Sequence, residues 1–200
     1  MPTSGDGPVS VIIDGQAREL PTGTTGEQVF AENRSVVVMR VDGELWDLAR
    51  ELPDGASVEP VDIESEDGLF VLRHSTAHVM AQAVQDLHED AKLGIGPPIK
   101  DGFYYEFEVP EPFDAADLTA IQKRMVAICK QGQRFVRRVV DPEQARAELA
   151  DEPLKLRLVD SEGGAEVMEV GGAELTIYDN VDRKGDTQWG DLCRGPHVPS

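Results

Sequence analysis

Short alternations of apolar and polar residues occupy the first third of the chain. Val9, Val11 and Ile13 take every second position, and Asp14-Gly15 follows them. An Asp-Gly pair readily adopts the positive φ angles of a two-residue hairpin turn. The same pattern returns further along and ends at Asp42-Gly43. We therefore expect two β-hairpins, with strands over residues 9–13, 17–20, 36–41 and 44–48.

A short helix and a last strand complete this pattern. Thr25 precedes Glu27 and Gln28, which is typical of a capping box at the start of a helix over about 26–33. Residues 58–63 form a further β-rich run. The order ββαβββ predicts a ubiquitin-like β-grasp domain over residues 1–65. The acidic, apolar-free segment 64–68 is expected to be a flexible boundary.

The hydrophobic period then changes from two to about 3.6. An apolar stripe predicts a helix over 70–89; its members are Ala77, Met80, Ala81, Val84 and Leu87. A second helix is expected over 114–131, and Asp141-Pro142 begins a third. Alternation predicts a strand through Phe103, Tyr105, Phe107 and Val109. Further strands, joined by glycine-rich turns, are expected over 155–160, 174–178 and 189–192. Residues 69–200 therefore indicate an α+β domain.

Composition narrows the class of protein. The formal net charge of −19 argues against a general nucleic-acid binder, because phosphate contacts need Lys and Arg. Residues 118–140 lack acids and form either a phosphate-facing patch or a solvated helix face; their cations are Lys123, Arg124, Lys130, Arg134, Arg137 and Arg138. Two cysteines provide no disulfide framework, and Cys129, beside the apolar stripe of its helix, is interpreted as a core residue. No secretory or membrane-spanning segment is evident, so we expect a cytoplasmic protein without membrane partners.

Three histidines and one cysteine form the candidate chemical site. His74 and His78 lie one helical turn apart and project from one face. Cys193 and His197 enclose Gly195 and Pro196, so they belong to a turn after a strand. One Cys and three His could bind zinc tetrahedrally. The same residues could instead act without metal, as bases and hydrogen-bond donors around a polar substrate.

Three motifs in this order resemble the threonyl-tRNA synthetase family. Residues 73–78 read R-H-S-T-A-H, similar to the family's R-H-S-x-A-H. Residues 95–97 and 101–107 read I-G-P and D-G-F-Y-Y-E-F, and the family has I-G-P-x-I-x-x-G-F-Y-Y-D-F. Residues 191–199 read D-L-C-R-G-P-H-V-P, similar to D-x-C-R-G-P-H-V-P. The family also begins with a β-grasp domain, called TGS, so the resemblance covers essentially the whole chain.

The resemblance implies an editing site that hydrolyses the ester of seryl-tRNA(Thr). Serine lacks one methyl group of threonine, and one methyl supports only about 10–200-fold discrimination, so a second pocket is needed. His74 would position or deprotonate water, and Lys155 would favour the charge that develops on the carbonyl oxygen. Asp191 would hold the substrate amino group. The residues that shape the pocket would be Cys193, His197 and Tyr105, with His78 beside them.

Cofactor and partners follow from the same resemblance. Alanyl-tRNA editing domains share the four-ligand pattern with zinc, whereas the threonyl family implies a site that requires no metal. The expected substrate is threonine tRNA charged with serine. The family's catalytic core and anticodon-binding domain have no counterpart here, so we expect no ligase activity from this chain alone and an editing domain truncated at its C-terminal end. The alternatives are a zinc-dependent alanyl-type deacylase and a non-catalytic module that binds RNA or protein.

Overall fold

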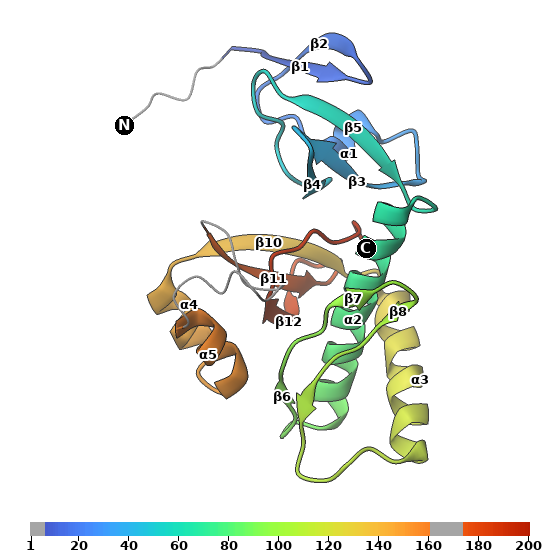
Figure 1. Cartoon of the computed structure of the whole chain (residues 1–200), viewed down its shortest axis with the longest axis vertical. Coiled ribbons are helices and arrows are strands. Elements are labelled where there is room, and N and C mark those ends of the chain that lie inside the picture. The colour runs from blue at the N-terminus through green and yellow to red at the C-terminus, as the bar shows by residue number, and fades with distance from the viewer. Residues whose placement is uncertain (1–6, 161–173) are drawn as a thin grey trace. The chain divides into compact units, whose positions relative to one another are not determined.

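The computed structural model describes residues 7–160 and 174–200 (Figure 1). The chain forms two compact units, one of residues 1–72 with 196–199 and one of residues 73–195 with 200. Both mix helices and strands, as expected for an α+β protein. In the described part of the chain, no helix is long and apolar enough to cross a membrane.

The first unit is a mixed sheet with a short helix. Its strand order is β2-β1-β5-β3-β4, with β1 and β5 parallel and the other pairs antiparallel. Both predicted Asp-Gly turns are confirmed, because all four of their residues have positive φ. The elements are β1 (Val9–Ile13), β2 (Gln16–Leu20), α1 (Gly26–Val29), β3 (Val36–Val41), β4 (Glu44–Asp47) and β5 (Ser57–Asp62).

Side chains that alternate along these strands form the core of the first unit. Val11 and Ile13 of β1 are buried with Met39 of β3 and Val58 of β5. The predicted cap of α1 is confirmed, since the Gln28 side chain accepts a hydrogen bond from the backbone N–H of Thr25. The helix ends at Val29, earlier than the expected residue 33.

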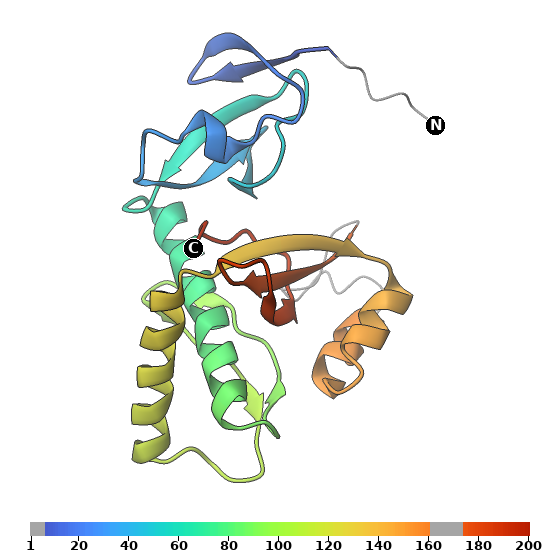
Figure 2. The same ribbon diagram turned by 180° about the vertical axis from the view of Figure 1, so that it is seen from behind.

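Helices α2 (Glu66–Leu87) and α3 (Ala115–Gln131) lie side by side in both views (Figures 1 and 2). Ala83 and Val84 of α2 pack with Ile121 and Ile128 of α3. Two corrections concern α2: it begins inside the segment expected to be flexible, and Leu87, expected on the buried stripe, is 44% exposed. The other helices are α4 (Pro142–Glu148), which has the predicted Asp141 cap, and α5 (Pro153–Asp160).

Among the described residues of the second unit, the strands form one three-stranded and two two-stranded sheets. The larger sheet has the order β10-β11-β12, and the smaller pairs are β6-β9 and β7-β8. The single strand expected through residues 103–109 is wrong, because it is divided between β8 and β9. The strands are β6 (Lys92–Leu93), β7 (Pro98–Ile99), β8 (Gly102–Phe103), β9 (Phe107–Glu108), β10 (Arg134–Val140), β11 (Leu175–Val181) and β12 (Thr187–Leu192).

The strand expected over 155–160 is also wrong, since these residues belong to α5. Leucines at 154, 156 and 158 alternate with charged residues, which mimics the period of a strand. Pro153 at the first helical position favours a helix instead. In the structure, Leu156 and Leu158 pack on the cluster that contains Ile177 of β11. The glycine-rich turn expected after this segment lies outside the described residues.

Candidate functional site

Helix α2 presents the first two residues of the site. His74 and His78 are both buried, and their ring centroids are 5.3 Å apart in an edge-on arrangement. Small residues Ala77 and Ala81 lie on the same side of the helix and are fully buried. Because these side chains are small, neighbouring elements can pack closely against the helix surface that carries the two imidazoles.

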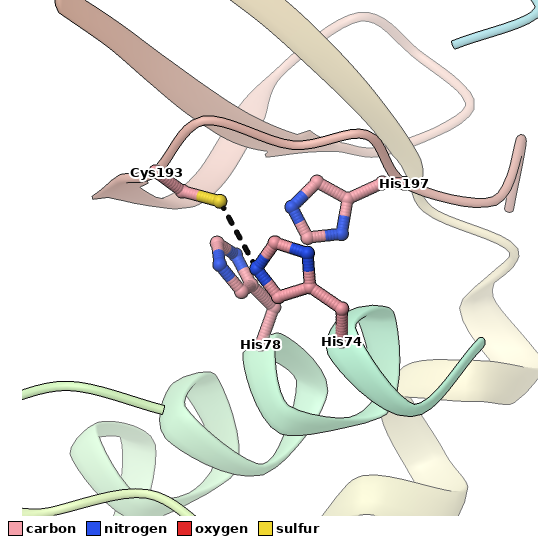
Figure 3. Close-up of side chains that lie close together, drawn as sticks. All are labelled: His74, His78, Cys193 and His197. Atoms are coloured by element: carbon pink, nitrogen blue, oxygen red, sulfur yellow. Dashed lines mark hydrogen bonds between the residues drawn. The ribbon is translucent and has the colours of Figure 1, made fainter. Parts of the chain in front are cut away.

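Cys193 and His197 follow β12 and complete a cluster of four buried residues (Figure 3). The candidate ligand atoms of His74, His78, Cys193 and His197 all lie within 4.8 Å of one another. Cys193 Sγ lies 3.1 Å from His74 Nε2, in hydrogen-bond contact. The four residues expected to share a site are therefore brought together.

The Cys193 turn depends on a close approach between Gly195 and Tyr178. Gly195 has a φ of +68°, and a Cβ atom there would lie 2.0 Å from Tyr178 Oη. The Gly195 backbone N–H donates to Cys193 Sγ at 3.1 Å. Only glycine accommodates both the left-handed backbone and the tyrosine, so the residue that shapes the turn also supplies a donor to the sulfur.

Burial determines the charge of His78. Desolvation lowers the pKa of His78 well below 6.5, and the neighbouring His74 and Lys155 lower it further. The imidazole of His78 is consequently neutral at pH 7 and offers one N–H donor and one acceptor nitrogen.

Asp191, Lys155 and Tyr105 form a second buried group in the same unit. Lys155 Nζ lies 2.9 Å from Asp191 Oδ2, and Tyr105 Oη donates to the same oxygen at 2.5 Å. Asp191 Oδ1 is buried and has no hydrogen-bond partner among the described residues. Oδ2 is thus anchored by two groups, while Oδ1 remains able to accept a hydrogen bond from a cation. All seven residues expected at the site are buried, in these two groups.

The cluster of four has the composition of a metal site. One thiolate and three imidazoles are ligands that suit zinc. Zinc–ligand bonds of 2.0–2.3 Å place tetrahedral ligands about 3.3–3.8 Å apart. The observed spread of up to 4.8 Å exceeds this by roughly an ångström, so small side-chain rotations would close the set. The donor set fits zinc, and these four residues would hold it.

Several polar residues beside the site were missed by sequence reasoning. Gln82 and Gln85 continue the line of His74 and His78 along α2 at helical spacing. Gln82 accepts from Asn180 Nδ2 at 2.8 Å. Gln85 contacts Trp189 and Glu152. The continued spacing of four and three residues was the signal that could have identified both glutamines.

Acidic side chains pair with several arginines of the basic segment 118–140. Arg124 pairs with Asp86, and Arg137 pairs with Glu174. Arg138 pairs with both Glu148 and Asp179, and these contacts raise the pKa of its guanidinium. At least three of the six cations expected in a phosphate-facing patch are therefore paired with acids. Cys129 is exposed rather than in the core.

Comparison with known proteins gives close relatives. The chain is 60% identical over 199 residues to threonine–tRNA ligase of Micrococcus luteus, covering 96% of this chain and 30% of that protein. It is 61% identical over 203 residues to the enzyme named threonine–tRNA ligase in Streptomyces griseus, covering 96% and 31%. The same name is carried by a relative in Streptomyces avermitilis, 61% identical over 202 residues, with 96% and 31% covered.

No protein-family model matches the chain. The chain spans about three tenths of the length of the curated relatives it matches. The three motifs around the buried site agree with these relatives' name, and the similarity extends over nearly the whole chain. The chain belongs to the threonine–tRNA ligase family.

Proposed function

We propose that this chain is an editing module that hydrolyses the ester of seryl-tRNA(Thr). Residues 1–65 would form the β-grasp TGS domain and residues 69–200 the editing domain. Aminoacylation would need the catalytic and anticodon-binding domains that the family implies, and these would be its partners in a longer enzyme. The observation that carries the proposal is Asp191 Oδ1, a buried carboxylate oxygen with no hydrogen-bond partner among the described residues, two positions before Cys193 of the cluster.

The charge on Asp191 suits the amino group of an aminoacyl ester. That ammonium group carries a positive charge and three donors, whereas Asp191 Oδ1 is an acceptor without a partner among the described residues. Because Tyr105 and Lys155 both hold Oδ2, the carboxylate cannot turn freely. Asp191 would therefore fix the amino acid by its amino group, which serine and threonine share.

The hydrolysis needs a general base, a cation or hydrogen-bond donor that stabilises the carbonyl oxygen, and room for a water molecule. A water molecule would attack the ester carbonyl carbon as His74 takes a proton from it. Lys155 would stabilise the negative charge that develops on the carbonyl oxygen. The bond from the carbonyl carbon to the ribose oxygen then breaks, that oxygen takes a proton, and serine and uncharged tRNA leave.

Size would provide the selectivity. The residues that would line the pocket are buried, and Tyr105 stacks on Phe107 with their ring centroids 4.8 Å apart. The threonine methyl group would need space that serine does not, and overpacking of this kind costs about 1–3 kcal/mol. Neutral His78 and the Cys193 sulfur would line the pocket beside the reacting ester.

The test is deacylation of seryl-tRNA(Thr) and threonyl-tRNA(Thr) by the purified chain. We expect faster release of serine, loss of this release in His74→Ala, and weaker substrate binding in Asp191→Asn. Glu143→Gln, which removes an exposed charge from α4, serves as the control. A folded chain that releases neither amino acid would contradict the proposal and favour a non-catalytic binding module.

A further inference from the structure

Gln85 joins a donor on one side to acceptors on the other. Trp189 Nε1 donates to Gln85 Oε1 at 2.7 Å. Gln85 Nε2 donates to Glu152 Oε1 at 2.7 Å and to the Ala91 carbonyl at 3.0 Å. An indole can only donate, and a carboxylate and a carbonyl accept. A carboxylate at position 85 would lose the second set of bonds, and an ammonium would lose the first.

Glu152 connects this amide to the start of helix α5. Its second carboxylate oxygen accepts from the Leu93 backbone N–H at 2.6 Å. Its own carbonyl accepts from the Leu156 N–H in the first turn of α5. Lys155 lies in that same turn and reaches Asp191. The anchored Glu152 side chain therefore helps to fix the first turn of α5, which carries Lys155.

Trp189 connects the same amide to the histidine cluster. Its ring contacts His78 edge-on, with centroids 5.6 Å apart at 90°. The bond from Nε1 to Gln85 restrains rotation of the indole, and the indole in turn forms one wall against the imidazole. Because His78 is fully buried, displacement of that wall would change the space that the ring occupies.

We propose that Glu152, Gln85 and Trp189 form a positioning relay, here called the Glu152 relay, that holds the Lys155–Asp191 pair and the His78 ring in register. The inference rests on the hydrolysis proposed above and extends it to residues that do not touch the substrate. Its three side chains come from β12, from α2 and from the residue before α5, so the relay joins separate elements of one unit.

Exchange of the two polar partners provides a sharp test. In Gln85→Glu, two carboxylates face each other. In Glu152→Gln, one amide cannot accept from both Gln85 and Leu93. In the double variant, the new carboxylate accepts from Trp189 and from the new amide, whose oxygen accepts from Leu93. Net charge is unchanged by the exchange, and only the Ala91 carbonyl loses a donor.

We expect each single variant to lower kcat for seryl-tRNA(Thr) hydrolysis by on the order of tenfold to a hundredfold, as misplacement of catalytic groups does. KM should change by less than about threefold, because the relay does not contact the substrate and Tyr105 still holds Asp191. The double variant should regain most of the lost kcat. Glu143→Gln, which makes the same charge change as Glu152→Gln at an exposed position on α4, should behave as wild type.

The Trp189 indole N–H resonance reports the relay independently of activity. The chain has two tryptophans, so the indole peak that remains in Trp46→Phe belongs to Trp189. Each single variant should shift this peak and the Lys155 and Asp191 backbone amides, and the double variant should restore them. Glu152→Gln is the decisive case, because among the described residues the hydrogen bonds from Glu152 reach Trp189 through Gln85.

The two proposals fail in distinguishable ways. If wild type releases serine and His74→Ala does not, yet both single variants keep the wild-type kcat and indole resonance, the relay is overturned while the editing proposal stands. If wild type releases no serine, editing is overturned, and the indole and Lys155 amide shifts decide the relay alone. The relay is also overturned if the single variants lose activity and shift the indole resonance, but the double variant restores neither kcat nor the resonance.

Discussion

Lys155 and Asp191 form an ion pair from which water is almost wholly removed, with Nζ 2.9 Å from Oδ2 and side chains 0% and 1% exposed. Two buried charges gain stability only when each compensates the other and the remaining hydrogen-bonding positions are filled. Tyr105 adds one further bond to the same oxygen. Oδ2 of Asp191 is therefore filled, whereas Oδ1 is left for the amino group in the proposed chemistry.

Removal of one partner of this pair should be costly. We expect Lys155→Met to lower the free energy of unfolding by about 3–5 kcal/mol, because Asp191 is left as an uncompensated buried charge. The double variant Lys155→Met, Asp191→Leu should lose less than the sum of the two single changes. Urea unfolding measures all three. Strictly additive losses would show that the two charges do not depend on each other.

Stability should depend on pH through His78. Its pKa is lowered in the folded chain by burial, His74 and Lys155, from an unfolded value of 6.5. Below pH 6.5, His78 binds a proton in the unfolded chain but stays neutral in the folded chain until the pH falls to its lowered pKa. The stabilisation is therefore complete above 6.5 and is lost as pH falls, with a slope of up to about 1.4 kcal/mol per pH unit.

Unfolding measured between pH 7.5 and 5.5 tests this dependence. His78→Gln should remove most of the change in the free energy of unfolding with pH over that range. His88→Gln, at a half-buried site beside Phe113, controls for the loss of a histidine. An unchanged slope in His78→Gln would assign the pH dependence to other groups.

Gly195 should tolerate no side chain. Gly195→Ala places a methyl group 2.0 Å from Tyr178 Oη at a φ of +68°. Left-handed backbone costs about 1–2 kcal/mol for alanine, and overpacking adds about 1–3 kcal/mol. Gly185→Ala is the matched control, because φ is +94° and nothing lies within 4 Å of its Cβ position. It should show the backbone cost alone in thermal unfolding.

Loss of the clash should rescue part of this effect. Adding Tyr178→Ala to Gly195→Ala removes the phenol oxygen that the new methyl would meet. The combined variant should be less damaged than the two single losses predict. If Gly195→Ala and Gly185→Ala are equally stable, the close approach of Tyr178 contributes nothing.

Hydrolysis should survive the removal of metal. The cluster of four residues fits zinc by its donor set, but its observed spread allows hydrogen bonds within the cluster, such as that between Cys193 and His74. We expect serine release to persist after prolonged chelation, with metal content checked by mass spectrometry. Activity that disappears on chelation and returns with one equivalent of zinc would favour the zinc-dependent, alanyl-type alternative.

Local sequence determined the elements whose geometry depends on neighbours along the chain. Asp14-Gly15 and Asp42-Gly43 adopt their predicted turns because few other pairs accept positive φ twice. The Asp141 cap and Pro142 begin α4 as predicted. The four cluster residues were identified by spacing and motif, since the imidazoles at 74 and 78 must share one face of a helix.

Tertiary structure decided what local pattern leaves open. Residues 154–158 alternate like a strand, yet α5 is helical, and its Leu156, Leu158 and Val159 pack against the Ile177 cluster. Segment 66–68 is acidic but begins α2. The side-chain partners of Asp191 and Gln85 lie 36 or more residues away along the chain. Such contacts depend on how sheets and helices pack, which no short-range period encodes, so the environment of the site emerged only from the folded chain.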